Sequence, residues 1–143
     1  MISLSAFVVP VFLDTNKTAE HMLRQWVRLY HYGHIYLPAL CIATCGLYGY
    51  AVLRRRAAGS KQWSRYALAA LLTIAMVPFT WMAMSPTNNI LFRLEGSGSP
   101  VDLDLVRGLV VKWAWLHVTR SLSPLFGAYL GFKGLVRELH ASA

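Results

Sequence analysis

A histidine and an arginine lie inside an apolar segment of this sequence, at a spacing that places them on one side of a helix. Trp113, His117 and Arg120 occupy positions i, i+4 and i+7 of the stretch WAWLHVTR, and such positions share one helical face. An arginine within a membrane span costs at least ~2.5 kcal/mol, so its presence indicates a function. The chemistry that this pair suits is removal of a proton by the histidine and stabilisation of an anion by the arginine.

No acidic residue lies where it could neutralise Arg120. The six acids all lie outside the apolar segments: Asp14, Glu20, Glu95, Asp102, Asp104 and Glu138. Arg120 is therefore expected to face an anion that the protein does not itself supply. Because a neighbouring cation and removal from water both disfavour an imidazolium, His117 is expected to stay neutral and basic near pH 7.

Four apolar segments can position these residues. They comprise residues 1–13, 32–53, 66–84 and 105–132, and the last three are long enough for the ~20 residues that a bilayer core requires. The first lacks a basic start and a small-residue cleavage site, which favours a short or tilted span over a signal peptide. Only 14% of the residues are charged, against about 25% in soluble domains. The sequence predicts an all-α, integral membrane four-helix bundle that forms a single domain over residues 1–143.

The segment between the first two apolar segments is amphipathic. Its apolar residues share one helical face and its arginines share another: Leu23, Trp26, Val27 and Tyr30, then Arg24 and Arg28. This pattern is typical of a helix that lies at the membrane interface. A structural role is expected for it, with a lid over the site as the alternative.

Alternating helices would bring further polar residues to the same end of the bundle. The start of the second apolar segment, the end of the third and the first half of the fourth would meet there, with the candidates Tyr30, His34, Trp81, Asn88 and Asn89. Each has a structural alternative. Tyr30 and Trp81 could be interfacial aromatics, and His34 could hydrogen-bond a backbone carbonyl. The asparagines follow a proline, so a cap or a turn would explain one of them, whereas two adjacent amides are harder to explain this way.

Several cofactor and partner classes lack their sequence signatures. There is no Glu-x-x-His pair for a di-iron bundle site and no Rossmann or Walker glycine pattern. Cys41 and Cys45, one helical turn apart, are interpreted as packing residues because no third ligand accompanies them. The net charge of +8 comes mostly from cations that flank apolar segments and anchor helices to lipid headgroups. No nucleic acid is therefore expected as a partner.

Parts of the sequence resemble the small membrane-bound anthrone oxygenases of fungal polyketide pathways. The resemblance covers nearly the whole chain and rests on HYGHIYLPAL, MVPFTWMAMSPTNNILFRLE and VVKWAWLHVTRSLSPLFGAYLG. The PTNN segment followed by WxxxHxxR is fairly specific to that group and its wider superfamily. Asn88, Asn89, Trp113, His117 and Arg120 occupy the family pattern.

The resemblance implies a cofactor-independent monooxygenase of the fungal endoplasmic reticulum membrane. It would convert an anthrone, such as emodin anthrone, to the anthraquinone with dioxygen, and no metal would be required. His117 would take a proton from the acidic methylene, while Arg120 and Asn88 would hold the anion beside Trp113. Tyr30, His34, Trp81 and Asn89 are the expected substrate-binding residues.

The expected partners follow from this activity and from the membrane segments. They are a small aromatic polyketide, dioxygen and membrane lipid. Two pairs, Gly46 with Tyr50 and Gly127 with Gly131, offer small-residue contacts that a homo-oligomer could use.

Two other function classes stay open at this point. His34 and His117 could be the axial ligands of a haem between helices, which would make the protein an electron carrier with a visible Soret band. A membrane carrier or scaffold for hydrophobic metabolites would instead bind an anthrone without turning it over. Aerobic incubation with an anthrone distinguishes these classes.

Overall fold

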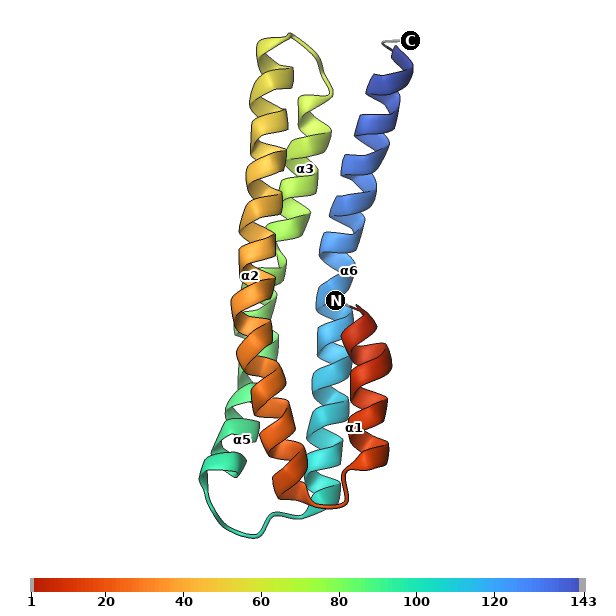
Figure 1. Cartoon of the computed structure of the whole chain (residues 1–143). Helices are drawn as coiled ribbons and strands as arrows, with labels where there is room; N and C mark the ends of the chain where they lie inside the picture. Colours follow the sequence, from red (N-terminus) through yellow and green to blue (C-terminus); the bar gives the residue numbers. More distant parts are fainter. Residues whose placement is uncertain (1, 142–143) are drawn as a thin grey trace. The chain divides into compact units, whose positions relative to one another are not determined.

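The residues that the computed structural model describes, 2–141, are helical except for short connections (Figure 1). In chain order the elements are the π-helix η1 (Leu4–Val8), α1 (Val9–Thr15), α2 (Ala19–Ala57), α3 (Trp63–Ile74), α4 (Met76–Phe79), the π-helix η2 (Thr80–Met84), α5 (Ser85–Gly96) and α6 (Leu103–Ala141). No strand occurs within these residues, so the predicted all-α class is confirmed. Met1, which begins the first predicted segment, lies outside the described residues.

Helix α2 joins two elements that the sequence predicts to be separate. The amphipathic segment and the second apolar segment form one helix of 39 residues, so the prediction of a separate interfacial helix is wrong. The junction near Tyr30 contains no residue that breaks a helix; a single glycine such as Gly33 costs only about 1 kcal/mol. Pro38 lies inside the helix without ending it, which membrane helices tolerate.

The third apolar segment also extends farther than predicted. Helical structure continues through α3, α4, η2 and α5 from Trp63 to Gly96. Pro86 stands in the first turn of α5, where its missing N–H removes no necessary hydrogen bond. Asn88 and Asn89 therefore lie within α5, so the alternative that one of them caps a helix or forms a turn is wrong.

Helix α6 contains the fourth apolar segment and begins after a loop. The residue before its first turn, Asp102, accepts a hydrogen bond through Oδ1 from the N–H of Asp104 at 3.3 Å. Such a side chain satisfies one of the free N–H groups at a helix start. The loop and this cap determine where α6, the helix that carries His117, begins.

The helices form two compact units, each made of two stretches of the chain. Unit 1 comprises Met1–Tyr36 and Pro78–Ser121, and unit 2 comprises Leu37–Val77 and Leu122–Ala143. Unit 1 thus contains the start of the second apolar segment, the end of the third and the first half of the fourth, which confirms their predicted convergence. The assignment of the whole chain to one domain stays a prediction.

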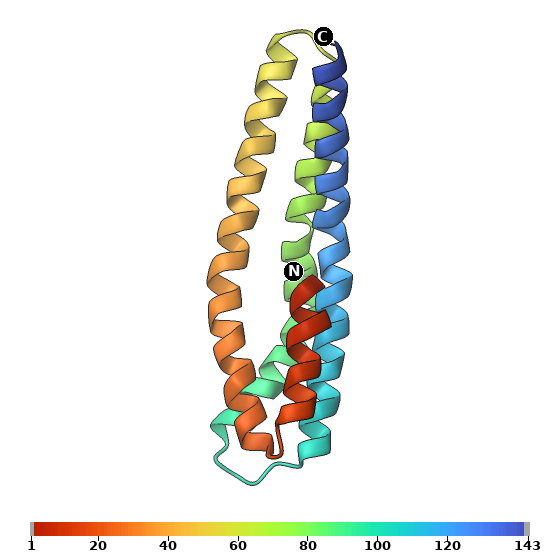
Figure 2. The ribbon, with the colours of Figure 1, turned by 45° about the vertical axis from the view of Figure 1, so that its right-hand side comes forward.

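The core of unit 1 positions the polar face of α6. Both views of the ribbon show α1 beside the first half of α6 (Figure 2). Buried residues from these helices, from the start of α2 and from η2 and α5 form one cluster: Val9, Ala19, Met22, Leu23, Trp26, Met84, Leu91, Val106, Val110 and Trp113. On α6 these residues recur every three or four positions, and His117 and Arg120 continue the same face.

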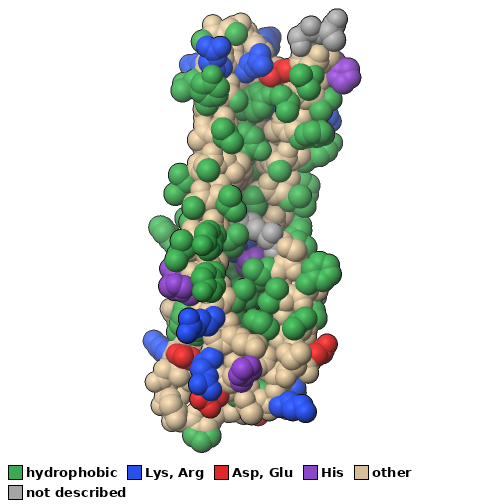
Figure 3. Space-filling model, viewed as in Figure 1, with side chains coloured by type: hydrophobic (Ala, Val, Ile, Leu, Met, Phe, Trp, Pro, Cys, Tyr) green, Lys and Arg blue, Asp and Glu red, His purple; other side chains and the backbone are tan. Residues whose placement is uncertain are grey.

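Two helical stretches are long and apolar enough to cross a membrane. They are Ala19–Ala57 and Trp63–Gly96, and in their most apolar windows only 6% and 22% of the residues are buried. A core helix of a soluble protein would be mostly buried there. Hydrophobic side chains are exposed along the helices (Figure 3), including Ile42 at 73% and Leu47 at 71%. These features are compatible with a membrane protein, while the four predicted spans stay a prediction.

Within unit 2, glycine allows a close approach between α6 and α3. A Cβ placed on Gly127 would lie 2.8 Å from the backbone oxygen of Ala69 and 2.9 Å from the hydroxyl oxygen of Thr73. The hydroxyl of Ser123 donates to the carbonyl of Leu72 at 2.6 Å, which ties the same two helices together. Gly127 therefore serves packing within the chain.

We expect Gly127→Ala to lower the stability of the protein by about 1–3 kcal/mol, because the new methyl group would overlap a backbone oxygen that cannot move independently of its helix. Thermal unfolding in detergent would measure the loss. The control is Gly46→Ala on α2, where a Cβ meets nothing within 4 Å and alanine is the better helix former. Equal melting temperatures for the two variants would contradict this packing role.

Candidate active site

His117 lies in the interior of unit 1, where it is only 2% exposed. Its ring centroid is 5.0 Å from that of Trp113, one helical turn earlier on α6. The Nδ1 atom lies 3.4 Å from the hydroxyl oxygen of Ser5 in η1. No group within residues 2–141 forms a hydrogen bond with the other ring nitrogen, Nε2. As far as the described residues show, that nitrogen is available to a ligand.

Arg120 is nearly buried, at 9% exposure, and lies one turn after His117. Its Nη1 donates to the hydroxyl of Thr80 at 3.0 Å, and its Nε is buried with no hydrogen-bond partner in the described part of the chain. The ion pairs found there involve other arginines, at positions 24, 55 and 107. Arg120 thus lacks a carboxylate partner within residues 2–141, as the positions of the acids predict.

A cluster of aromatic rings adjoins His117. The ring of Trp26 lies 6.1 Å from that of Trp113, edge to face. It also lies 5.4 Å from Tyr30 and 5.1 Å from Phe92. These rings form an apolar cluster, and its two edge-to-face pairs, Trp26 with Trp113 and Trp26 with Phe92, contribute about 0.5–1.5 kcal/mol each.

Several buried polar atoms of this region have no hydrogen-bond partner among the described residues. Three are donors: the indole N–H groups of Trp26 and Trp113 and the Nε–H of Arg120. One is an acceptor, the Oδ1 of Asn88, and this residue is only 4% exposed. Each buried polar atom without a partner costs about 1–3 kcal/mol, and such atoms in native proteins call for an explanation. A ligand that carries oxygen atoms and a hydroxyl group would satisfy them.

The structure brings five of the predicted site residues into unit 1's interior or its edge. His117, Arg120, Trp113 and Asn88 are buried, and Tyr30 is half-buried. Together they combine a base, a cation, an amide and aromatic surfaces, which suits proton removal from a flat, acidic substrate.

Three of the predicted substrate-binding residues lie outside this interior. Trp81 is 73% exposed, and Asn89 and His34 are exposed as well. His34 Nδ1 lies 3.2 Å from the carbonyl oxygen of Tyr30, which confirms the backbone hydrogen bond considered as its structural alternative. Because adjacent helical residues differ by about 100° in direction, Asn88 and Asn89 cannot face the same interior. The roles of Trp81, Asn89 and His34 in substrate binding stay predictions.

Three contacting residues lie outside the set that the sequence predicts. The sequence pattern places Trp26 only on an apolar helical face, although a buried indole has an N–H group that needs a hydrogen-bond acceptor. Thr80 carries a usable signal, because it shares a helical face with Thr87 and Asn88. Ser5 carries none, since its contact with His117 joins positions 112 residues apart.

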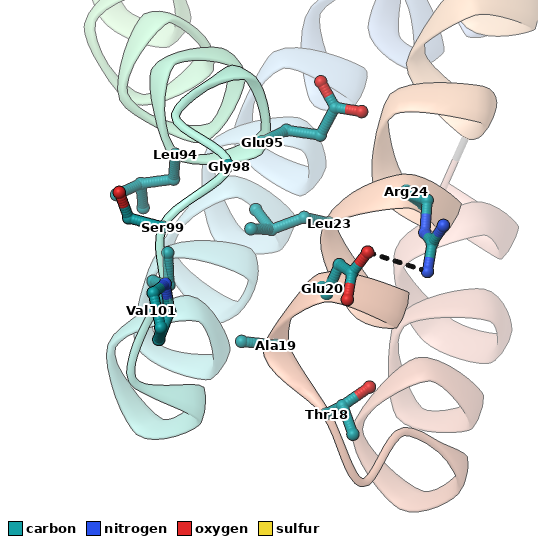
Figure 4. Close-up of a pocket in the computed structure, with 11 residues that line it drawn as sticks. Thr18, Ala19, Glu20, Leu23, Arg24, Leu94, Glu95, Gly98, Ser99 and Val101 are labelled. Atoms are coloured by element: carbon teal, nitrogen blue, oxygen red, sulfur yellow. Dashed lines mark ion pairs between the residues drawn. The ribbon is translucent and has the colours of Figure 1, made fainter.

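A separate pocket of about 580 Å³ lies at the start of α2 and the loop after α5, within unit 1 (Figure 4). It contains the ion pair between Arg24 and Glu20, at 3.0 Å, but none of the predicted site residues. The described residues contain no group of three histidine, cysteine, aspartate or glutamate side chains that could hold a metal ion. The candidate active site is therefore the buried face of α6 with its neighbours.

Comparisons with known proteins find relatives described as anthrone oxygenases. A family model described as anthrone oxygenase matches residues 26–130. The anthrone oxygenase nsrD of Aspergillus novofumigatus is 64% identical over 97% of this chain and 86% of its own length. An anthrone oxygenase of a Cryptosporiopsis species is 55% identical over 97% and 79%, and gedH of Aspergillus terreus is 49% identical over 97% and 91%. No solved structure matches the chain.

Proposed function

The chain belongs to the anthrone oxygenase family, and we propose that it oxidises an emodin-anthrone-like polyketide to the anthraquinone with dioxygen and without a cofactor. Membership of this family means that the chain is an enzyme, namely an oxidoreductase. The substrate, the mechanism and the residue roles are the proposal.

The observation that carries the mechanism is the pairing of His117 with Arg120 on one buried face of α6. The histidine keeps Nε2 free, and the arginine lacks a carboxylate partner in the described part of the chain. A neutral imidazole beside an uncompensated cation suits a reaction in which a proton leaves carbon and an anion forms. A cation in a site from which water is excluded stabilises an anion more strongly than it would in water.

In the first step, His117 Nε2 removes a proton from the methylene carbon of the anthrone. The carbon–hydrogen bond breaks, and its electron pair becomes part of an aromatic anthranolate anion. Arg120 stabilises the oxygen of that anion through its guanidinium. The indole N–H groups of Trp26 and Trp113 can donate to further ring oxygens, while Asn88 Oδ1 accepts from a ring hydroxyl.

In the second step, the electron-rich anion transfers one electron to dioxygen, which gives a carbon radical and superoxide. Their combination forms the carbon–oxygen bond of a peroxide, which takes a proton from the His117 imidazolium. Loss of the second methylene proton and cleavage of the oxygen–oxygen bond give the quinone carbonyl and water. One anthrone and one dioxygen thus yield one anthraquinone and one water, so no external reductant is needed.

The surroundings of the site are part of the same proposal. We place the helices in the endoplasmic reticulum membrane of a fungus as a four-helix bundle, because α2 and the 63–96 stretch are apolar and largely unburied. An apolar polyketide would then reach the site from the lipid, which also excludes the water that would weaken the contact between Arg120 and the anion.

We expect protein purified in detergent to convert emodin anthrone to the quinone at full rate after exhaustive treatment with a metal chelator. The uncatalysed rate, measured without protein, is subtracted. Isotope-labelled dioxygen should leave one labelled oxygen in the quinone and one in water, as the balance above requires. Product formation is followed by visible absorbance and mass spectrometry.

Three outcomes would contradict the proposal. Binding of the anthrone without turnover would make the protein a carrier. A Soret band whose loss abolishes activity would make it a haem protein. Activity that chelation removes and one metal restores would assign the chemistry to that metal.

A further inference from the structure

Ser5 is a buried polar residue that connects η1 to α6. It is 8% exposed and lies in a π-helix, a rare helical form that is often found at functional sites. Its hydroxyl oxygen is 3.3 Å from the carbonyl oxygen of Ala114 and 3.4 Å from Nδ1 of His117. Ala114 and His117 lie three residues apart on α6, so one hydroxyl reaches both.

The two contacts of Ser5 together decide which ring nitrogen of His117 carries the proton. A serine hydroxyl has one hydrogen to donate and lone pairs to accept with. A carbonyl oxygen can only accept, so the contact with Ala114 requires the hydroxyl to donate there. The contact with His117 is then satisfied only if Nδ1–H donates to the serine oxygen. With the hydroxyl turned toward Nδ1 instead, the contact with Ala114 would be lost.

We infer that Ser5 is a positioning residue that holds His117 as the Nδ1–H tautomer, so that the Nε2 lone pair faces the substrate. The tautomer of a catalytic histidine is set by the hydrogen bond that its other nitrogen makes. Ser5 lies outside the region that the family model matches, residues 26–130. The catalytic consequence rests on the proposed function, in which Nε2 is the base, whereas the tautomer itself does not.

Nitrogen-15 NMR of histidine-labelled protein in detergent tests the tautomer without any turnover. The two ring nitrogens of a neutral imidazole have widely separated shifts, and a His117→Gln sample identifies the signals of His117. We expect a protonated Nδ1 in the wild-type protein and in Ser5→Thr, which keeps the hydroxyl. In Ser5→Ala, the signals should shift toward a mixture or toward protonated Nε2.

Kinetics with emodin anthrone test the consequence. We expect Ser5→Ala to lower kcat about 10-fold with KM unchanged, since a hydrogen bond worth about 1.4 kcal/mol corresponds to a tenfold change. Ser5→Thr should restore most of the rate. The matched control is Thr15→Ala, which removes an exposed hydroxyl that donates to the backbone carbonyl of Val11 at the end of α1, and it should have no effect.

The two measurements separate this inference from the proposed function. A protonated Nε2 in the wild-type protein would overturn the positioning role even if the protein turns anthrone over. Absence of turnover in the wild-type protein would overturn the proposed function, while a tautomer that changes only in Ser5→Ala would still support the role of Ser5. Equal loss of rate in Ser5→Ala and Ser5→Thr, with an unchanged tautomer in both, would reduce Ser5 to packing.

Discussion

Replacing His117 with alanine should lower kcat on emodin anthrone at least ~100-fold, within the range that general bases contribute. The imidazole Nε2, which has no hydrogen-bond partner within residues 2–141, is the basic nitrogen on the buried face of α6. Without it, the methylene proton must leave to water, which the apolar interior excludes. In the proposed mechanism proton removal starts the reaction, so the loss should appear in kcat and kcat/KM alike. Stopped-flow measurement of quinone absorbance gives both constants.

His140→Ala is the matched control for this variant. It removes a histidine from the same helix, α6, but one that is exposed and whose Nδ1 lies 2.8 Å from the carbonyl oxygen of Val136. We expect its rate to equal that of the wild-type protein. Since His117→Ala leaves a cavity, His117→Gln and a melting curve for each variant show whether the fold survives. Wild-type turnover by folded His117→Ala would leave His117 with a packing role only.

The buried face of α6 is the part of the site that the sequence predicts best. Trp113, His117 and Arg120 follow a helical period, and this local pattern is independent of which helices pack against it. The convergence of the segments in unit 1 is also predictable, because short connections force successive spans to alternate in direction. The family resemblance adds the activity, which composition and periodicity do not supply.

Two element boundaries could not be predicted for a shared physical reason. Both errors place a boundary where hydrophobicity changes, near Tyr30 and near Pro86. A change in polarity does not end a helix unless a residue there breaks the hydrogen-bond ladder. The backbone stays helical through both positions, so each helix extends beyond its apolar part.

The remaining errors concern which side of a helix enters the interior. Trp81 follows Thr80, which contacts Arg120, and Asn89 follows Asn88, which is buried. In an α-helix such as α5, a one-residue step turns the side chain by about 100°, and the sequence alone does not show which of two neighbouring side chains faces the core. Ser5 belongs to a different class, because only the folded chain brings it to His117.

Arg120→Met should slow anthrone turnover by about 100-fold or more while leaving the protein equally stable or more stable. Loss of one group that stabilises a developing oxyanion costs roughly 10²–10³ in kcat. Stability should not fall, because within the described residues the side chain donates a hydrogen bond to Thr80 and has no carboxylate partner. Replacing an uncompensated buried charge with an apolar side chain of similar length is often neutral or stabilising.

Arg120→Lys separates the charge of the guanidinium from its shape. Lysine keeps the cation but loses the planar fork, in which Nη1 contacts Thr80 while Nε–H is still free for a ligand. We expect this variant to fold and to retain a rate between those of the wild-type protein and Arg120→Met. Arg107→Met is the control, because it removes a half-exposed arginine of the same helix whose partner is Asp104, and exposed pairs of this kind contribute little.

Melting temperature and turnover, measured on the same samples, decide between a catalytic and a structural arginine. A catalytic Arg120 predicts that the rate falls in the order wild type, lysine, methionine while the melting temperature holds or rises. A structural Arg120 predicts the reverse pattern: Arg120→Met unfolds at a lower temperature, and Arg120→Lys keeps full rate because any cation serves. The second pattern would leave the anion without its proposed partner, and proton removal by His117 would then have to rely on the indole N–H groups of Trp26 and Trp113 alone.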